Sequence, residues 1–245
     1  MNTESYLSAI YQRCSRRKYI NRPIQSTEVQ ALEAAICKYN ESSGLKIQLI
    51  LEKGEELFGG FRKSYGLLSG VKNYIALVGS KNDPNYKEKI GRYGELLVLE
   101  ATAMGLSTCW VGGSYDKKNA AALYAENEIL NCVIAIGYCE NKLSLKERLI
   151  GNKSHRKAAF KNPRMKSSGN TPDWFLKGME AVAFAPSALN LKPFLFHYDN
   201  GSVHAELTKK HDFALIDLGI AKLHFELGAG GGEWEYGDGG KFQLT

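Results

Sequence analysis

The pattern of apolar positions alternates between helix-like and strand-like segments along the whole chain, which is typical of an α+β protein. Apolar residues recur every three or four positions in some segments and form short β-branched runs in others. The helices that this pattern predicts cover residues 3–12, 27–38, 83–104, 118–124, 171–184 and 214–229. The predicted strands and extended segments cover residues 46–51, 73–79, 106–113, 131–138, 193–198 and 202–207, with a short strand or tail over 233–245.

Local signals set several boundaries of these elements. Thr27-Glu28-Val29-Gln30 predicts a capping box at the start of the second helix. Gly105 predicts the end of the third helix, and Asn200-Gly201 predicts a two-residue turn that joins two strands into a hairpin. Residues 96–104 and 214–229 are apolar on nearly all sides, so we expect two long helices in the centre of the core.

The two halves of the chain present their elements in the same order. Each half has an amphipathic helix, a polar break, a strand containing Leu-Lys and a long apolar helix that ends in glycine. The segments that match are residues 45–49 with 191–195, and residues 100–103 with 226–229. We therefore predict two related half-units, residues 1–150 and 151–245, each with an antiparallel or mixed sheet, packed as an intramolecular pseudo-dimer. The charged residues 140–172 are expected to connect them.

Composition excludes several classes of protein. The 245 residues are 44% hydrophobic and 24% charged, as in an ordinary soluble globular protein. The net charge of +6 is diffuse, and no basic block is interleaved with aromatic residues, which argues against nucleic acid. No run approaches the roughly 20 apolar residues of a membrane span. The five cysteines are odd in number and form no Cys-x-x-Cys, so we expect a reducing, cytoplasmic compartment and no zinc site.

The best-known catalytic motifs are absent. The sequence has no G-x-G-x-x-G after a strand, no P-loop and no G-x-S-x-G elbow. The five histidines are scattered without metal-ligand spacing. The sequence therefore predicts no catalytic acid or base and no metal ligand.

The residues with the clearest chemical signal form the basic segment, Arg13-Cys14-Ser15-Arg16-Arg17-Lys18-Tyr19. In an extended conformation, Arg13, Ser15 and Arg17 lie on one side. Guanidinium groups and a hydroxyl suit a phosphate, whereas a charge run can also be a solvated face. Three further segments could contact a flat, phosphorylated ligand. They are Trp110-Val111-Gly112-Gly113, Arg156-Lys157 and Pro186-Ser187-Ala188-Leu189-Asn190.

Together these segments resemble the motifs of the flavin-dependent nitroreductase family. The basic segment with Pro23-Ile24 is similar to the family's N-terminal Arg-Arg-Ser-x-Arg-x-Phe…Pro-Val motif. Residues 185–194 are similar to Pro-Ser-Ala-x-Asn-x-Gln-Pro-Trp, and residues 105–113 to Gly-Leu-Gly-x-x-Trp-x-Gly. Ile136-Gly137-Tyr138 followed by Arg156-Lys157 is similar to the Gly-Tyr-Pro…Arg-Lys end.

The order of the motifs differs from the common family pattern. The Pro-Ser-Ala-x-Asn motif usually follows the Arg-Ser-Arg motif closely, but residues 39–43 occupy that place here and the motif lies in the second half. The chain thus resembles a duplicated, single-chain branch, which implies one FMN site per chain built by both halves, in a monomer or a weak dimer. Two residues also differ: Cys14 replaces an arginine, and Lys192 stands where glutamine is usual.

The resemblance implies an FMN-dependent oxidoreductase with the nitroreductase fold. NADH or NADPH would reduce the flavin, which would reduce a nitroaromatic, a quinone or a similar small acceptor. The cofactor-binding residues that it implies are Arg13, Ser15, Arg17, Trp110, Val111, Gly112, Gly113, Arg156, Lys157, Pro186, Ser187, Ala188 and Asn190. Three alternatives remain open: a related flavin chemistry such as dehalogenation or flavin destruction, a non-catalytic protein that stores or senses FMN, and an unrelated anion-binding module.

Overall fold

The computed structural model describes residues 1–59, 68–143, 147 and 164–245, and these residues group into two compact units. The β1–β4 unit draws on residues 12–86 and 96–152. The β5–β9 unit draws on residues 1–11, 87–95 and 153–245. The predicted division at residue 150 and the predicted pseudo-dimer stay predictions.

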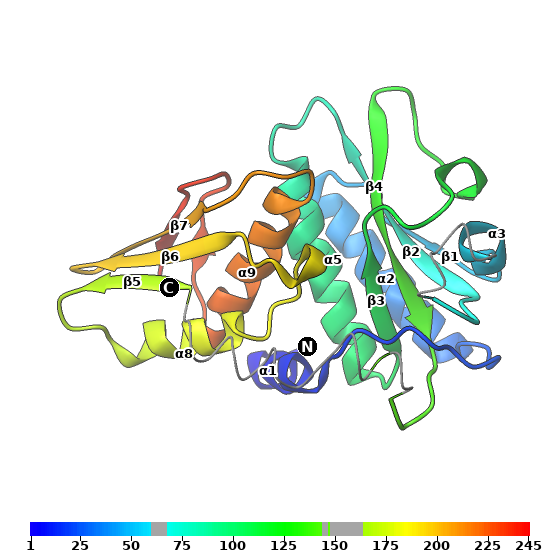
Figure 1. Cartoon of the computed structure of the whole chain (residues 1–245), viewed down its shortest axis with the longest axis horizontal. Coiled ribbons are helices and arrows are strands. Elements are labelled where there is room, and N and C mark those ends of the chain that lie inside the picture. Colours follow the sequence, from blue (N-terminus) through cyan, green and yellow to red (C-terminus); the bar gives the residue numbers. More distant parts are fainter. Residues whose placement is uncertain (60–67, 144–146, 148–163) are drawn as a thin grey trace. The chain divides into compact units, whose positions relative to one another are not determined.

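The β1–β4 unit is built around an antiparallel sheet, which has four strands among the described residues (Figure 1). Its order is β1 (Gln48–Ile50), β2 (Asn73–Ser80), β4 (Glu128–Gly137) and β3 (Ser107–Val111). Tyr74 to Val78 of β2 are fully buried, as is the centre of β4. This confirms the four predicted strands, with β2 and β4 in the core and β3 at an edge.

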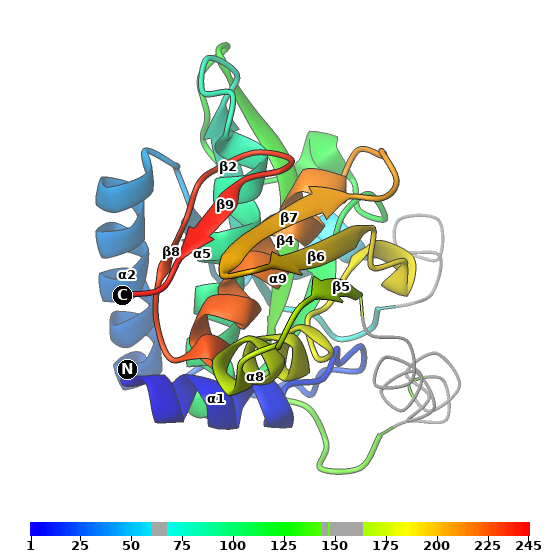
Figure 2. The ribbon, with the colours of Figure 1, turned by 90° about the vertical axis from the view of Figure 1, so that its left-hand side faces the viewer.

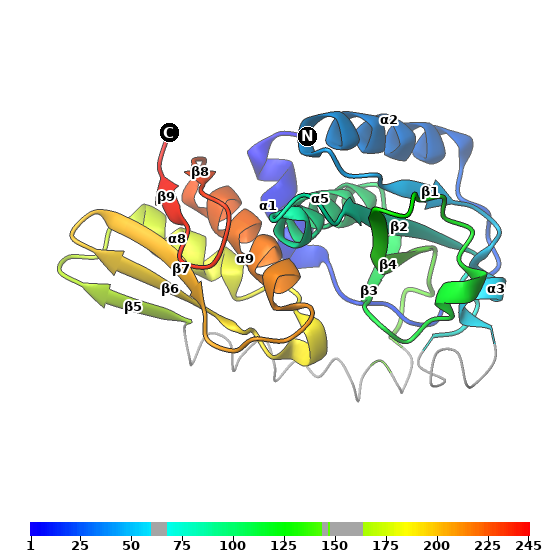
Figure 3. The ribbon, with the colours of Figure 1, turned by 90° about the horizontal axis from the view of Figure 1, so that it is seen from above.

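Helix α2 (Ser26–Ser43) lies beside β1 in the same unit (Figure 3). The capping box begins at Gln25, whereas the sequence predicted that it begins at Thr27. In the structure the Glu28 carboxylate accepts the N–H of Gln25 at 2.9 Å. The helix also continues beyond the predicted end at residue 38. It ends at Gly44, whose φ of 72° lies in the left-handed region that favours glycine. A short helix, α3 (Gly54–Phe58), precedes residues 60–67, which lie outside the described residues.

The helix predicted over residues 118–124 is wrong. Only a short 3-10 turn, η1 (Lys117–Asn119), forms there. The backbone N–H groups that follow donate to side chains of the sheet instead of to a helical carbonyl. Ala121 N–H donates to the Tyr74 hydroxyl at 2.8 Å, and Leu123 N–H donates to Gln48 Oε1 at 2.8 Å. These bonds hold the segment extended against the sheet.

The sheet of the β5–β9 unit has the order β5 (Met165–Ser168), β6 (Phe194–Asp199), β7 (Ser202–Leu207), β9 (Lys241–Gln243), β8 (Glu233–Trp234) (Figure 2). β5 pairs in parallel with β6, and the other pairs are antiparallel. The predicted hairpin is confirmed: Asn200 and Gly201 have φ of 46° and 95°, as a two-residue turn with two left-handed positions requires. The prediction that residues 140–172 serve only to connect the two halves is wrong, because Met165–Ser168 form strand β5. It is an exposed edge strand, so it carries no apolar pattern.

Helices α8 (Asp173–Val182) and α9 (Ala214–Ala229) cover one face of this sheet (Figure 2). α9 is buried continuously from Ile216 to Phe225, and its bounds are those predicted. Its contact with the sheet is aromatic, because the rings of Phe196 and Phe225 stack with centroids 5.2 Å apart. α1 (Thr3–Gln12) belongs to the same unit, where the ring of Tyr11 packs edge-on against Phe184.

Helix α5 (Tyr86–Ala103) contributes residues 87–95 to the β5–β9 unit, where they pack closely against α9. A Cβ atom at Gly91 would lie 2.1 Å from the carbonyl oxygen of Ile216. A Cβ atom at Gly219 would lie 2.1 Å from the carbonyl oxygen of Glu88. The two helices therefore touch backbone to backbone, and both positions require glycine.

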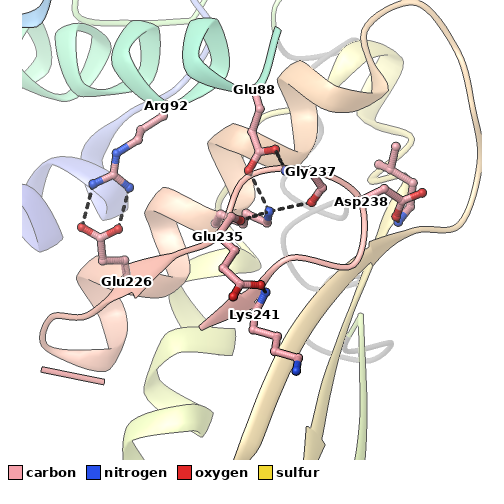
Figure 4. A network of polar contacts seen from close by, with 9 residues as sticks. Glu88, Arg92, Glu226, Glu235, Gly237, Asp238 and Lys241 are labelled. Atoms are coloured by element: carbon pink, nitrogen blue, oxygen red, sulfur yellow. Dashed lines mark hydrogen bonds and ion pairs between the residues drawn. The ribbon is translucent and has the colours of Figure 1, made fainter. Parts of the chain in front are cut away.

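A buried polar network joins α5, α9 and the turn between β8 and β9 (Figure 4). The Lys222 ammonium donates to Glu88 Oε1 at 2.7 Å and to the carbonyls of Glu235 and Gly237 at 2.9 Å each. The second Glu88 oxygen accepts the N–H of Gly237 at 2.6 Å. Arg92 and Glu226 form a separate two-bond pair between the same helices. The buried charges thus have several hydrogen-bond partners, as buried charges require.

The described residues therefore form an α+β fold with two sheets. None of the helices in the described ranges is long and apolar enough to cross a membrane.

Candidate functional site

The basic segment is extended and runs alongside β3. Ser15 pairs in parallel with Thr108, and Arg16 N–H donates to the Thr108 carbonyl at 3.0 Å. Further on, Tyr19 N–H donates to Ser69, and Ile20 N–H donates to Tyr138. The segment therefore adds a short extended stretch at the β3 edge of the sheet.

The three residues of the predicted phosphate clasp, Arg13, Ser15 and Arg17, all influence the pKa of one buried thiol in the β1–β4 unit, that of Cys109. Burial raises the pKa of Cys109, while the charges of Arg17 and Arg13 and a hydrogen bond with Ser15 oppose that rise. The charge of Glu147 adds to that rise. The placement of Arg13, Ser15 and Arg17 on one side of the segment stays a prediction from the alternation of an extended backbone. The segment thus brings two guanidinium groups and a hydroxyl into the region of this thiol.

The alternate residues of the segment have a structural role instead. Arg16 donates through Nε to Glu147 Oε1 at 3.1 Å and through Nη2 to the Glu140 carbonyl at 2.7 Å. The same Glu147 oxygen accepts the N–H of Arg17 at 2.7 Å. Glu147 thereby fixes the backbone of the clasp. The sequence analysis did not identify it, because it is 130 residues away.

A polar pocket of about 380 Å³ opens on this alternate side. It is lined by Arg16, Lys18, Glu140, Asn141, Lys142 and Glu147. None of these is a predicted cofactor residue, and the lining carries both signs of charge. We therefore assign the pocket no part in the candidate site.

Residues 110–113 comprise the end of β3 and the bend that follows it. Trp110 and Val111 are the last residues of the strand and pair with Ile134 and Val133. The bend at Gly112 and Gly113 comes next, and a Cβ atom at Gly113 would meet nothing within 4 Å in the described chain. Packing against the described residues therefore does not explain the glycine at 113. The basic segment and residues 110–113 lie on neighbouring stretches of the β1–β4 unit.

The predicted segment Pro186–Asn190 forms a tight turn in the β5–β9 unit, between α8 and β6. It contains a 3-10 turn, η2 (Ala188–Asn190), in which Leu189 and Asn190 have φ of 50° and 56°. Left-handed backbone costs a residue other than glycine roughly 1–2 kcal/mol. Asn190 N–H donates to the Ser187 carbonyl at 3.0 Å, and Lys192 N–H donates to Ser187 Oγ at 3.0 Å. The turn is therefore held in a strained conformation by its own hydrogen bonds.

Two charged residues anchor this turn. Lys192 donates through Nζ to the carbonyls of Ala183 and Ala185, at 3.1 and 2.8 Å, so its ammonium caps the end of α8. Asp217, in the first turns of α9, accepts the N–H of Ala188 with both carboxylate oxygens, at 3.0 and 3.1 Å. The sequence analysis did not identify Asp217. The available signal was an acidic side chain near the start of a largely apolar helix.

The remaining predicted residues, Arg156 and Lys157, lie outside the described residues. In the part of the chain that the structure describes, no group of three or more His, Cys, Asp or Glu side chains is placed to hold a metal ion.

Comparison with known proteins identifies the family. The sequence profile of the family described as "Putative TM nitroreductase" matches residues 6–229. The chain belongs to this nitroreductase family. No curated protein matches the sequence.

One solved structure covers the whole chain and shares this fold. A structure described as a "putative nitroreductase" from Thermotoga maritima covers 100% of this chain and 94% of its own, with a TM-score of 0.62 and 22% identity. Two others align over little more than half of this chain. The FMN-dependent nitroreductase of Clostridium difficile is 20% identical over 56% of this chain and 90% of its own, with a TM-score of 0.43. A protein of Bacteroides thetaiotaomicron, described as "Putative NADH dehydrogenase/NAD(P)H nitroreductase", is 18% identical over 58% of this chain and 92% of its own, with a TM-score of 0.43.

Proposed function

We propose that this nitroreductase-family protein is an FMN-dependent oxidoreductase. NADH or NADPH would be the electron donor, and a nitroaromatic, a quinone or a similar small molecule the acceptor. The observation that carries the proposal is the extended basic segment beside β3, in which Arg13, Ser15 and Arg17 alternate along the chain and all act on the Cys109 thiol. This donor set fits a phosphate monoester such as that of FMN, because guanidinium groups offer paired donors and the hydroxyl adds a third.

The flavin, when bound, would supply the hydride-transfer chemistry. The chain's own residues would bind and orient it. Arg13, Ser15 and Arg17 would hold the phosphate, with Arg156 and Lys157 assisting. Trp110, Val111, Gly112 and Gly113 would contact the ring system, with backbone N–H groups of the two glycines as donors. Pro186, Ser187, Ala188 and Asn190 would pack against the ring and hydrogen-bond to it. We assign no side chain as a catalytic acid or base.

The first test is the absorbance spectrum of the purified protein, with and without added FMN, before and after anaerobic addition of NADPH or NADH. We expect a flavin spectrum at about one FMN per chain that bleaches with the nicotinamide. A protein that takes up FMN without oxidising NADH or NADPH would be a flavin-binding protein without turnover. A protein that stays colourless in the presence of FMN would refute the proposal.

A second test separates the two sides of the basic segment. Arg17→Ala removes a charge-assisted contact worth about 1.5–3 kcal/mol, so the Kd for FMN should rise about 10- to 100-fold. Lys18→Ala is the matched control. It removes the same charge from the next residue, whose exposed side chain lies on the other side of the segment, so the Kd should change little. Equal losses in both variants would mean that the segment acts only through its net charge. The Kd is measured by quenching of FMN fluorescence.

A further inference from the structure

The turn Ser187–Asn190 is joined to helix α9 through one buried carboxylate. Asp217 is 3% exposed, and its two oxygens accept the same N–H, that of Ala188. The other described bonds of the turn are local to residues 183–192. Asp217 therefore links the strained turn to a helix that is fixed in the core of the unit.

Two charged or titratable groups in the described structure face the Asp217 carboxylate. The ammonium of Lys192, from the turn, stabilises the ionised carboxylate electrostatically. His211, from the segment before α9, places its Nε2 atom 3.8 Å from Asp217 Oδ2, which is too long for a hydrogen bond. His211 Nδ1 accepts the N–H of Phe213 at 3.3 Å, so the neutral ring carries its proton on Nε2 and points it at Asp217. Of these two neighbours, Lys192 favours the ionised carboxylate.

We propose that Asp217 is a positioning residue, whose ionised carboxylate fixes the Ala188 amide and thereby the Ser187–Asn190 turn. This inference rests on the proposed function in one respect, the assignment of that turn to the cofactor. An ionised oxygen accepts a hydrogen bond about twice as strongly as a neutral one. The turn is therefore ordered most firmly when Asp217 is charged, and protonation weakens its link to α9.

The buried position makes this charge costly to the fold. Burial raises the pKa of Asp217 to about 7 from its usual 3.8, against the opposing effects of the Ala188 N–H and Lys192. Because the pKa in the folded state is the higher one, the contribution of Asp217 to stability is present below about pH 4 and is lost as the pH rises through 7. Between pH values below 4 and pH values well above 7, this effect lowers the folding equilibrium constant on the order of a thousandfold. Asp217 thus orders the turn at the expense of stability.

The decisive experiment follows the Ala188 amide in the cofactor-free protein by NMR. We would label the alanines with ¹⁵N, assign the Ala188 signal by its loss in Ala188→Gly, and record its shift from pH 5.5 to 8.5. We expect a sigmoidal shift with a midpoint within about one unit of 7. The shift should vanish in Asp217→Asn and persist in Asp212→Asn, which removes an exposed acid five residues away. A flat wild-type curve, or a titration that survives in Asp217→Asn, would overturn the assignment. A titration that disappears in His211→Gln but survives in Asp217→Asn would assign it to the histidine.

Two further measurements distinguish positioning from a purely structural role. In Asp217→Asn the Kd for FMN at pH 8 should rise about tenfold and no longer depend on pH. Urea unfolding at pH 8 should show this variant at least as stable as the wild type, because it removes a buried charge. A variant that loses both stability and affinity would contradict the positioning role. If the wild-type protein does not bind FMN, the proposed function fails while the Ala188 titration still tests the role of Asp217.

Discussion

Replacing Lys222 with alanine should lower the free energy of unfolding by about 3–5 kcal/mol, because it leaves the Glu88 carboxylate buried without its cation. Both side chains are almost fully buried, at 2% and 4% exposure. Burial raises the pKa of Glu88 and lowers that of Lys222, so each charge is kept mainly by the other. The change also leaves the carbonyls of Glu235 and Gly237 without their donor. Urea unfolding followed by circular dichroism at pH 7 measures the loss.

The matched control for this prediction is the double variant Lys222→Met with Glu88→Gln. It removes both charges while keeping the volume, and glutamine can still accept the N–H of Gly237. Replacing both members of a buried ion pair is often nearly neutral, so the double variant should recover most of the stability. If Lys222→Ala costs less than about 1 kcal/mol, or if the double variant is less stable than the single one, the network in Figure 4 does not hold the unit as we describe.

Replacing Gly219 with alanine should destabilise the protein by about 3 kcal/mol, the upper part of the range for overpacked cores. The new Cβ atom would lie 2.1 Å from a backbone oxygen of α5, which cannot rotate away. The usual effect in a helix has the opposite sign, since alanine is better than glycine by about 1 kcal/mol. A loss at this position is therefore a direct measure of the contact between α9 and α5. Thermal and urea unfolding both report it.

The control for Gly219→Ala is Gly113→Ala, because a Cβ atom there would meet nothing within 4 Å in the described chain. Its backbone is not left-handed, so alanine should leave the stability unchanged or slightly higher. A second, reciprocal variant, Gly91→Ala, should resemble Gly219→Ala, since its Cβ atom would lie 2.1 Å from the Ile216 carbonyl oxygen. If either helix variant is as stable as the wild type, the helices are farther apart than the structure shows.

The sequence predicted elements best where local chemistry decides the structure. Residues 214–229 are apolar and end at a glycine, and α9 has the predicted bounds. Asn200-Gly201 suits one kind of turn, and the hairpin was correct. β5 could not be predicted because an exposed edge strand needs no apolar face. The helix over residues 118–124 failed because two side chains of the sheet take the backbone N–H groups of that segment.

In the candidate site, too, features that depend on local sequence were predictable and features that depend on distant contacts were not. The alternation of Arg13, Ser15 and Arg17 follows from an extended backbone, and the structure shows the segment extended beside β3. The residues that support the site were not predictable, because their roles depend on contacts between distant parts of the chain. Glu147 binds the backbone of Arg17 from 130 residues away, and Asp217 binds Ala188 from 29 residues away. No local pattern indicates which of the acidic side chains meets a particular amide.

The division of the chain among the two units imposes an order on folding during synthesis. Every stretch of the β1–β4 unit has been translated by residue 152. The β5–β9 unit instead combines residues 1–11 and 87–95 with the last part of the chain. The ring contact between Tyr11 and Phe184 can form only after Phe184 has been translated. The ion pair between Glu88 and Lys222 likewise forms only after Lys222 has been translated. A nascent chain therefore carries the N-terminal helix α1 and the Glu88 carboxylate without their partners until translation is nearly finished.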